Sequence, residues 1–415
     1  MPTSKSVLVI GAGTFGLSTA YHLAKSGYSH ITVLDKSEFL PSNISAGHDV
    51  NKIIRAEDES PWYADLSLEA MKVWTEDPLF SPYYHQVGYL LANSPAAPEK
   101  AKQTLAKSLS NISNRPAWQG KIKPLNTRAD IRDVAPAFDG PMEWKGYFNS
   151  LAGWAHATDS MHAVYSACCL LGVDFRLGIT VEKLAWKGDK CIGAYSASGE
   201  LYPADVTVVS LGASVAAVVP DLAPQITAKA FAVAHIQLTP AEALKLRGIP
   251  VTYARDLGFF FEPDPRTGLL KLCPSGAGIT NYRNTKVSLP PVDSNYIPAH
   301  DEEAMRKLLR ETLPWLADRP LISKHMCWIA DTRDSAYVFD YLPGKTGVVV
   351  ATGDSGTAFK MLPIAGQWVK KVIEDGKQSE PRWQWKNVSG SNDDVSWRVG
   401  KPYDLSEEPR IVSKL

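Results

Sequence analysis

Apolar residues mark out a strand–helix–strand unit at the start of the chain. Residues 7–10 are all apolar, which predicts a strand buried on both faces. A helical pattern then runs to about Lys25, and Gly27 is a typical residue at which a helix ends. A second strand is predicted over residues 30–34 and ends at Asp35. This order is typical of a parallel α/β sheet.

The turn between the first strand and the helix carries three spaced glycines. Gly11 permits a tight turn, Gly13 lets the backbone approach a pyrophosphate, and Gly16 lets the helix pack closely on the strand. The helix start, with Thr14, offers unpaired N–H groups to phosphate. Asp35 lies 19 residues after Gly16, where an acid can bind ribose hydroxyls. The motif predicts a dinucleotide site but does not separate FAD from NAD.

Later apolar patterns change in character along the chain. Residues 173–177, 180–186 and 191–196 predict a short β-meander, and residues 204–212 predict a buried strand that ends at Gly212. From about residue 220 to 327, alternation favours antiparallel strands, which predicts a separate substrate domain. An all-apolar strand over residues 348–352 then enters a glycine turn, from which we expect a helix to continue to Asp375.

Composition excludes several classes of protein. Lys plus Arg and Asp plus Glu both number 44, so no polyanion-binding surface is indicated and no nucleic-acid partner is expected. No apolar run reaches the length of a membrane span. The five cysteines show no metal-ligand spacing, and we expect no metal site. At 415 residues, two domains are expected.

Small residues and isolated cations mark further candidate positions. Residues 42–47 suit a loop folded against a planar ligand, to which we assign Ser42, Ser45, Ala46 and Gly47. Two cations, Lys52 and Arg55, flank an apolar pair, and composition slightly favours a solvated basic turn over a ligand site. Lys271 interrupts an apolar strand, where a surface position and a buried functional position are both open.

The chain ends in Ser413-Lys414-Leu415. This tripeptide at a free C-terminus is a peroxisomal address that an import receptor recognises. We therefore expect a peroxisomal protein, which would suit a flavin enzyme that makes hydrogen peroxide.

Six motifs are spread over nearly the whole chain: the glycine motif, S-A-G-x-D-V-N-K at 45–52, G-W-A-H-A at 153–157, F-F-x-E-P-D at 259–264, C-W-x-A-D-T at 327–332 and G-x-S-G-x-x-F-K at 353–360. In this order they resemble the motifs of fungal fructosyl amino acid oxidases and, more broadly, of monomeric sarcosine, pipecolate and saccharopine oxidases. The resemblance implies an α/β fold with a Rossmann-type FAD domain built from discontinuous segments, and a substrate domain with a large antiparallel sheet. We expect the FAD domain in 1–86, 148–222 and 327–415, the substrate domain in 87–147 and 223–326, and a monomer.

The resemblance also implies roles for single residues. FAD would be covalently bound through Cys327, Lys271 would activate oxygen, and Arg55 and Lys360 would bind the substrate carboxylate. Lys52 is a further candidate catalytic residue. Further FAD-binding positions implied by the match are Val181, Gly212, Asp354, Gly356, Phe359 and Lys360. The implied reaction is oxidation of a secondary amine by O2.

Departures from the family pattern bear on the substrate. Sugar-handling oxidases carry an acidic pair where this chain has Pro274-Ser275, and Thr357-Ala358 replaces the usual His or Arg followed by Gly. An N-alkyl or cyclic amino acid, such as an N-methyl amino acid, pipecolate or saccharopine, is therefore favoured over a fructosyl amino acid. An NAD-dependent dehydrogenase, a flavin hydroxylase and a flavoprotein without catalysis are the alternatives, and each leaves Cys327 or the cations unexplained.

Overall fold

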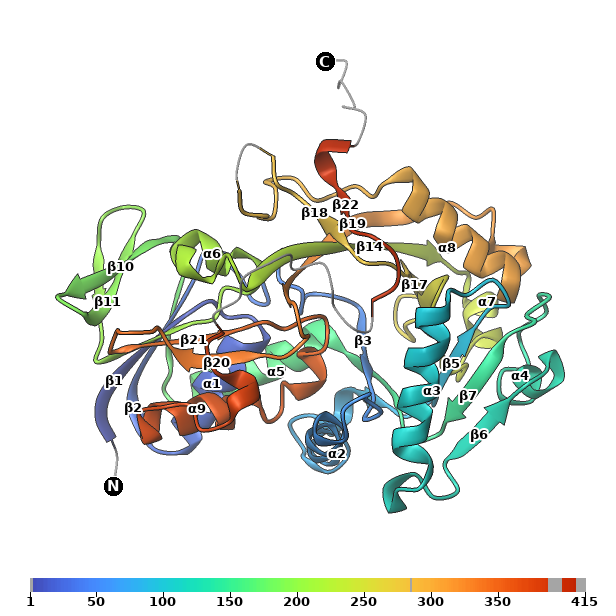
Figure 1. Cartoon of the computed structure of the whole chain (residues 1–415), viewed down its shortest axis with the longest axis horizontal. Coiled ribbons are helices and arrows are strands. Elements are labelled where there is room, and N and C mark those ends of the chain that lie inside the picture. The colour runs from blue at the N-terminus through green and yellow to red at the C-terminus, as the bar shows by residue number, and fades with distance from the viewer. Residues whose placement is uncertain (1–2, 284–285, 387–397, 408–415) are drawn as a thin grey trace.

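A parallel sheet forms one end of the computed structural model, which describes residues 3–283, 286–386 and 398–407 (Figure 1). Its strand order is β20-β21-β13-β1-β2-β9, and all neighbours are parallel except the edge strand β20. The strands are β1 (Thr3–Ile10), β2 (Tyr28–Asp35), β9 (Asp174–Leu177), β13 (Val206–Val209), β20 (Val338–Tyr341) and β21 (Val348–Thr352). Both β13 and β21 are buried along their whole length, as expected for central parallel strands.

Both faces of β1 are covered because its side chains alternate between two apolar clusters. Val7 and Val9 pack with the helices α1 (Thr14–Lys25), α5 (Ala157–Leu170) and α9 (Ala365–Asp375). Leu8 and Ile10 pack on the opposite side with residues of β10 (Val181–Lys187) and β11 (Lys190–Ser196). The all-apolar run thus reflects burial on both faces.

A small antiparallel meander differs from its prediction. It consists of β10, β11 and β12 (Leu201–Pro203). Residues 173–177, predicted as its first strand, instead form β9 and pair with β2 in the parallel sheet. Periodicity identified the strand, but it could not identify which neighbour the strand would bond to.

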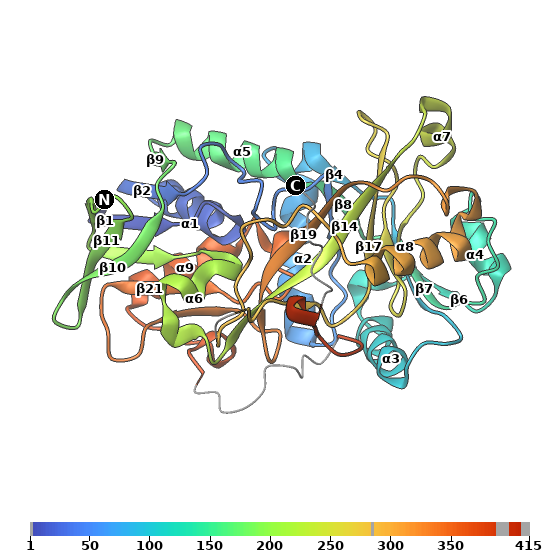
Figure 2. The ribbon, with the colours of Figure 1, turned by 90° about the horizontal axis from the view of Figure 1, so that it is seen from above.

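A ten-stranded sheet dominates the other end of the molecule (Figures 1 and 2). Its path is β22-β18-β14-β17-β16-β15-β5-β7-β6, with β19 paired to β14. The strands are β5 (Tyr89–Asn93), β6 (Ile122–Leu125), β7 (Lys145–Asn149), β14 (Ile226–Gln237), β15 (Val251–Ala254), β16 (Gly258–Phe260), β17 (Leu269–Pro274), β18 (Ile279–Thr280), β19 (Ile322–Thr332) and β22 (Tyr403–Asp404). Most of these pairings are antiparallel. The predicted fold class is therefore confirmed.

A third, three-stranded sheet is built from strands that are far apart in the sequence. It contains β3 (Asn51–Ile54), β8 (Gly153–His156) and β4 (Tyr84–His85), in the order β3-β8-β4. The remaining helices are α2 (Pro61–Glu76), α3 (Glu99–Ser113), α4 (Arg128–Val134), α6 (Val215–Val218), α7 (Pro240–Lys245) and α8 (Ala299–Thr312). Among the residues described, no helix is long and apolar enough to cross a membrane.

The sheets relate to the expected domain ranges as follows. Strands from 87–147 and from 223–326 share the ten-stranded sheet. Two strands differ from the expected domain ranges. The strand β19 crosses the boundary at 326, and β22 joins the ten-stranded sheet although it lies in the range 327–415. The long strand β19 thus connects the large sheet to the FAD-domain ranges, and the ranges themselves stay a prediction.

The helix expected directly after the glycine turn at 353 begins later than predicted. A short 3-10 turn, Phe359–Met361, comes first, and α9 starts at Ala365. Its predicted end is right, because Gly376 caps it in the left-handed conformation at φ 69°. The glycine turn therefore does not lie at the N-terminus of α9.

Candidate active site

The glycine turn after β1 has the close packing that its sequence predicts. A Cβ on Gly16 would lie 1.8 Å from the carbonyl oxygen of Gly11, and Gly11 itself has φ 97°. The Asp35 carboxylate accepts hydrogen bonds from Ala12 N at 2.8 Å and from Ser37 N at 2.9 Å. No acidic residue occupies the first turn of α1, which begins at Thr14. These features fit the pyrophosphate and ribose of an adenine dinucleotide.

The small-residue loop lies against this turn. A Cβ on Gly13 would be 3.7 Å from Ser45 Oγ, and one on Gly47 would be 3.3 Å from Thr14 Oγ1. Ser42 is buried, and its hydroxyl has no hydrogen-bond partner among the described residues. The structure thus brings the loop that includes Ala46 to the glycine turn, and it leaves a buried hydroxyl for a ligand to satisfy.

Two further predicted FAD positions lie on a turn held by β19. The Asp354 carboxylate accepts hydrogen bonds from Ala330 N at 2.8 Å and from Gly356 N at 3.0 Å. Burial raises the pKa of Asp354 to about 6 against the effect of these bonds. A Cβ on Gly356 would be 3.7 Å from Ile329 Cδ1. The turn therefore packs on Ile329, which follows Cys327 by two residues on β19.

The remaining predicted FAD positions are more dispersed. Gly212, at φ 51°, begins a 3-10 turn that contacts β19. Val181 opens β10 close to Asp35, whose carbonyl accepts a hydrogen bond from Ile179 N at 2.9 Å. Phe359 turns its ring onto Trp74, with a centroid distance of 5.9 Å, so its side chain packs in the core.

A buried ion cluster joins the three-stranded sheet to the ten-stranded sheet. Asp49 bonds the Nζ of Lys271, and it lies 2.8 Å from the Nζ of Lys52. Lys271 also donates to the carbonyl of Asn51 at 2.9 Å and lies 5.0 Å from the centroid of the Phe261 ring. Lys271 is 1% exposed, so the surface interpretation of this lysine is wrong.

The charges of this cluster stabilise one another. Burial alone would raise the pKa of Asp49, but the ammonium groups of Lys271 and Lys52 hold it far below its usual range. Burial would likewise lower the pKa of Lys52, but Asp49 and Cys327 raise it. Two cations therefore share one carboxylate, and the cluster keeps a net positive charge.

Cys327 lies at the edge of this cluster. It sits on β19 opposite Phe231 of β14, is partly exposed, and its Sγ is 3.8 Å from the Nζ of Lys52. A nucleophilic thiolate at this position would face a fixed positive charge.

Arg55 and Lys360 lie together in a second cationic site. Arg55 donates to the carbonyl of Glu57, and its guanidinium lies 5.7 Å from the centroid of the Tyr89 ring. Lys360 is 5% exposed; its Nζ lies 4.0 Å from Asp58 and makes no hydrogen bond among the described residues. Lys52 lies in β3, Arg55 follows it directly and both are only partly exposed, so the two cations do not form a solvated turn.

Burial lowers the pKa of Lys360 to about 8, and repulsion from Arg55 adds to this effect although Asp58 opposes it. The pKa of Arg55 is raised, because Tyr89, Glu57 and Asp58 outweigh its burial. The backbone of Lys360 is fixed by a hydrogen bond from Trp74 Nε1 to its carbonyl at 2.8 Å. An anion placed here would satisfy the Lys360 ammonium and relieve the repulsion.

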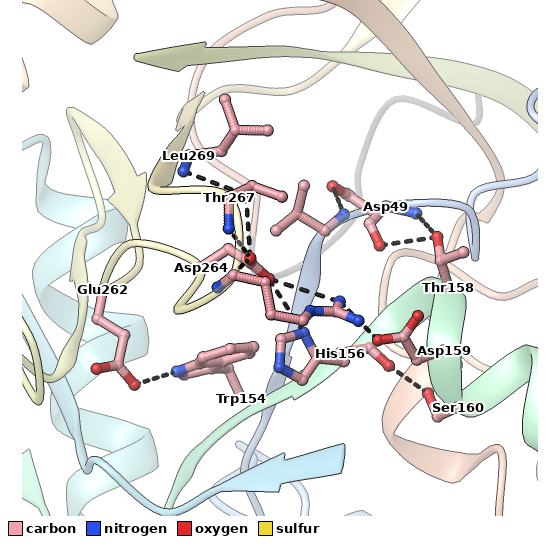
Figure 3. Close-up of polar contacts among 12 residues, drawn as sticks. Asp49, Trp154, His156, Thr158, Asp159, Ser160, Glu262, Asp264, Thr267 and Leu269 are labelled. Atoms are coloured by element: carbon pink, nitrogen blue, oxygen red, sulfur yellow. Dashed lines mark hydrogen bonds and ion pairs between the residues drawn. The ribbon is translucent and has the colours of Figure 1, made fainter. Parts of the chain in front are cut away.

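Polar contacts from the β16–β17 connection hold the ten-stranded sheet against β8 and α5 (Figure 3). Trp154 Nε1 donates to Glu262 at 2.8 Å, and His156 lies 3.3 Å from Asp264. These side chains come from two of the motifs, G-W-A-H-A and F-F-x-E-P-D, so those motifs join the two parts of the fold.

Several functional residues were missed by sequence reasoning. Asp49 stood in a quoted motif without a role, although a buried lysine implies a carboxylate partner. Asp331, on β19, is bound by Lys229 at 3.0 Å and by Arg398 at 2.7 Å in a buried triad that no sequence spacing predicts. No cluster of His, Cys, Asp and Glu that could hold a metal occurs among the residues that the structure describes.

Comparisons with known proteins identify the family of this chain. The family model described as FAD dependent oxidoreductase matches residues 6–371, and the chain belongs to this family. The chain is 32% identical to L-saccharopine oxidase of Schizosaccharomyces pombe, over 95% of this chain and 96% of that protein. It is 23% identical to a monomeric sarcosine oxidase of Bacillus, over 91% of this chain and 95% of that one.

Solved structures of oxidases also resemble this chain. Fructosamine oxidase (Amadoriase II) of Aspergillus fumigatus superposes with a TM-score of 0.90 at 33% identity, covering 97% of this chain and 96% of its own. The resemblance stated from motifs is therefore confirmed, and FAD is the cofactor that the family implies.

Replacing Asp49 by Asn tests the ion cluster. The change leaves two buried ammonium groups without their carboxylate, and we expect it to lower the free energy of unfolding in urea at pH 7 by about 3–5 kcal/mol. Glu69→Gln, on the exposed face of α2, is the control and should change little.

The pH dependence of that difference has a fixed sign. The native pKa of Asp49 lies below its unfolded value, so its stabilisation is present above about pH 4 and is lost as the pH falls further. The difference in free energy of unfolding between wild type and Asp49→Asn should therefore shrink towards about pH 3. A gap that is absent at pH 7, or that grows in acid, would contradict this account.

Proposed function

We propose that the protein is an FAD-dependent oxidase of secondary α-amino acids, either N-alkyl or cyclic, that releases an imine and hydrogen peroxide. The observation that carries this proposal is the buried Lys360 ammonium, which has no hydrogen-bond partner among the described residues and lies near Arg55. A substrate carboxylate would bridge the planar fork of Arg55 and the point charge of Lys360. The names of the saccharopine and sarcosine oxidase relatives support this class of substrate.

We assign the rest of the substrate to a cavity of about 300 Å³, whose wall includes Arg255, Ser275, Lys401 and Tyr403 but neither Arg55 nor Lys360. The buried Arg255 interacts electrostatically with Tyr89, as Arg55 does, and this relates the cavity to the carboxylate site. Asp256 and Asp301 also line the cavity, so its two cations are matched by two carboxylates. Fructosyl amino acid oxidation is the alternative, favoured by the solved neighbours, but Ser275 has no acidic charge to offer a sugar and its hydroxyl already bonds the Arg255 carbonyl.

FAD would lie between the glycine turn and β19, where it would accept a hydride from substrate and pass two electrons to oxygen. The residues that would hold it are Gly11, Gly13, Thr14, Asp35, the 42–47 loop and the Asp354–Gly356 turn. Covalent attachment through Cys327 is part of the proposal, and the ammonium of Lys52 at 3.8 Å supports it. Lys271, on the other cationic site, would stabilise negative charge that develops on oxygen.

Peroxisomal location is also part of the proposal. It rests on Ser413-Lys414-Leu415, which lies outside the described residues. An import receptor would be the protein's partner through this tripeptide.

Substitutions at the carboxylate site test the substrate class. We expect Lys360→Met and Arg55→Ala each to lower kcat/KM for a secondary amino acid by about 10- to 100-fold, because each removes a charged hydrogen bond. In wild type, kcat/KM should rise with pH as the substrate amine loses its proton and fall above about pH 8, as Lys360 loses its charge.

Peroxide release measures both effects, and Lys72→Met, an exposed lysine on α2, is the matched control. The corresponding amine without a carboxylate should be a poor substrate that neither variant affects. If wild type oxidised that amine as fast as the amino acid, the proposed carboxylate site would be wrong.

Cys327→Ser tests covalent attachment. Acid-precipitated wild type should keep its yellow colour, whereas the Ser variant should release flavin to the supernatant, because a hydroxyl is a much weaker nucleophile than a thiolate. Cys169→Ser, at an exposed cysteine, should behave as wild type. A colourless wild-type pellet would refute the covalent bond.

A further inference from the structure

A second cavity, of about 660 Å³, adjoins the Lys271–Asp49 ion pair. Its wall includes His48, Asp49, His235, Asp264, Arg266 and His325. Figure 3 shows part of this wall, with Asp49 beside Thr158 of α5, and Asp264 on the β16–β17 connection. Arg266, whose side chain is largely exposed, lies 2.7 Å from Asp159 at the edge of this wall. The cavity is separate from the one that contains Arg255 and Ser275.

His235 is the unusual member of this wall. It lies on β14 directly opposite Lys271 of β17, so the two side chains point to the same face of the sheet. It is 4% exposed, and neither ring nitrogen makes a well-formed hydrogen bond among the described residues. The carbonyl of Ser323 is near enough to affect its titration, but its geometry is not that of a hydrogen bond. Buried polar groups of this kind are normally satisfied by water.

The surroundings of His235 keep it neutral. The pKa of His235 is lowered to about 4, chiefly by burial. The negative charge of Asp49 raises this pKa, whereas Lys271 and His325 lower it further. His325 stacks on His235 with a centroid distance of 6.3 Å, and its own Nδ1 lies 3.1 Å from the Ser323 carbonyl. A neutral imidazole has one donor and one acceptor nitrogen, which is the complement that water or hydrogen peroxide needs.

We propose that this cavity carries O2 to Lys271 and hydrogen peroxide away from it, and that His235 is a positioning residue that holds water or peroxide beside the Lys271 ammonium. The proposal rests on the proposed oxidase function. One amine and one O2 give one imine and one hydrogen peroxide. The C–H bond yields an electron pair and a proton, and the amine N–H yields the second proton. That second proton is released on the substrate side, and an equivalent proton enters through the water of this cavity.

The test measures the two half-reactions separately by stopped flow on the flavin-loaded protein. Flavin is reduced anaerobically, once with a secondary amino acid and once with dithionite, and is then mixed with O2. Reoxidation of His235→Phe should be slower by about five- to tenfold, because the hydrogen bonds to water are lost. Reduction by substrate should be unchanged. His235→Gln keeps a donor and an acceptor, so it should recover most of the reoxidation rate, and Asn295→Ala, at an exposed residue of the same wall, is the control.

Each other outcome overturns the proposal. If His235→Phe is reoxidised at the wild-type rate, His235 has no such role. If His235→Gln is slowed as much as His235→Phe, His235 is merely structural. If Asn295→Ala is slowed as much, the effect belongs to the wall as a whole. If His235→Phe does not fold, a crystal structure of wild type decides instead, by the presence or absence of an ordered water about 3 Å from a His235 nitrogen. Dithionite keeps this test independent of the substrate, so failure of substrate reduction alone would count only against the proposed function.

Discussion

The buried carboxylate of Asp49, shared by Lys271 and Lys52, is the interaction on which the site depends. Removing charges from water is costly, and only close opposite charges compensate for it. Asp49 precedes β3, whereas Lys271 lies on β17, so the pairing fixes the small sheet against the large one. It also sets the position of Lys52 and thereby the charge that faces Cys327.

The two cationic sites differ in how far their charge is neutralised. Lys271 and Lys52 share a carboxylate at hydrogen-bond distance, and this pairing holds both ammonium groups in place. Lys360 has only Asp58, at 4.0 Å, and its lowered pKa shows that its charge is poorly compensated. The first site is suited to stabilising a small charge that develops during reaction, and the second to binding a preformed anion. This difference links the electrostatics to the proposed reaction.

The sequence predicted those parts that local rules determine. Gly11, Gly16 and Asp35 hold their expected positions, because a strand, a tight turn and a helix follow one another along the chain. The partners of Lys271 lie more than 200 residues away, and no periodicity encodes such a contact. The late start of α9 and the pairing of β9 with β2 were missed for the same reason, since both depend on tertiary packing. The motif at 45–52 contained Asp49, but nothing in it indicated that this carboxylate pairs with Lys271.

Lys271→Met gives the most direct test of the division between the two cationic sites. Methionine keeps all but one atom of the side chain's length and removes its charge. The account predicts that reaction of the reduced flavin with O2 slows by about a hundredfold or more, because a fixed charge beside the developing anion is lost. Anaerobic reduction by a secondary amino acid should be much less affected, since Arg55 and Lys360 remain. Equal loss in both half-reactions, measured by stopped flow, would contradict the account.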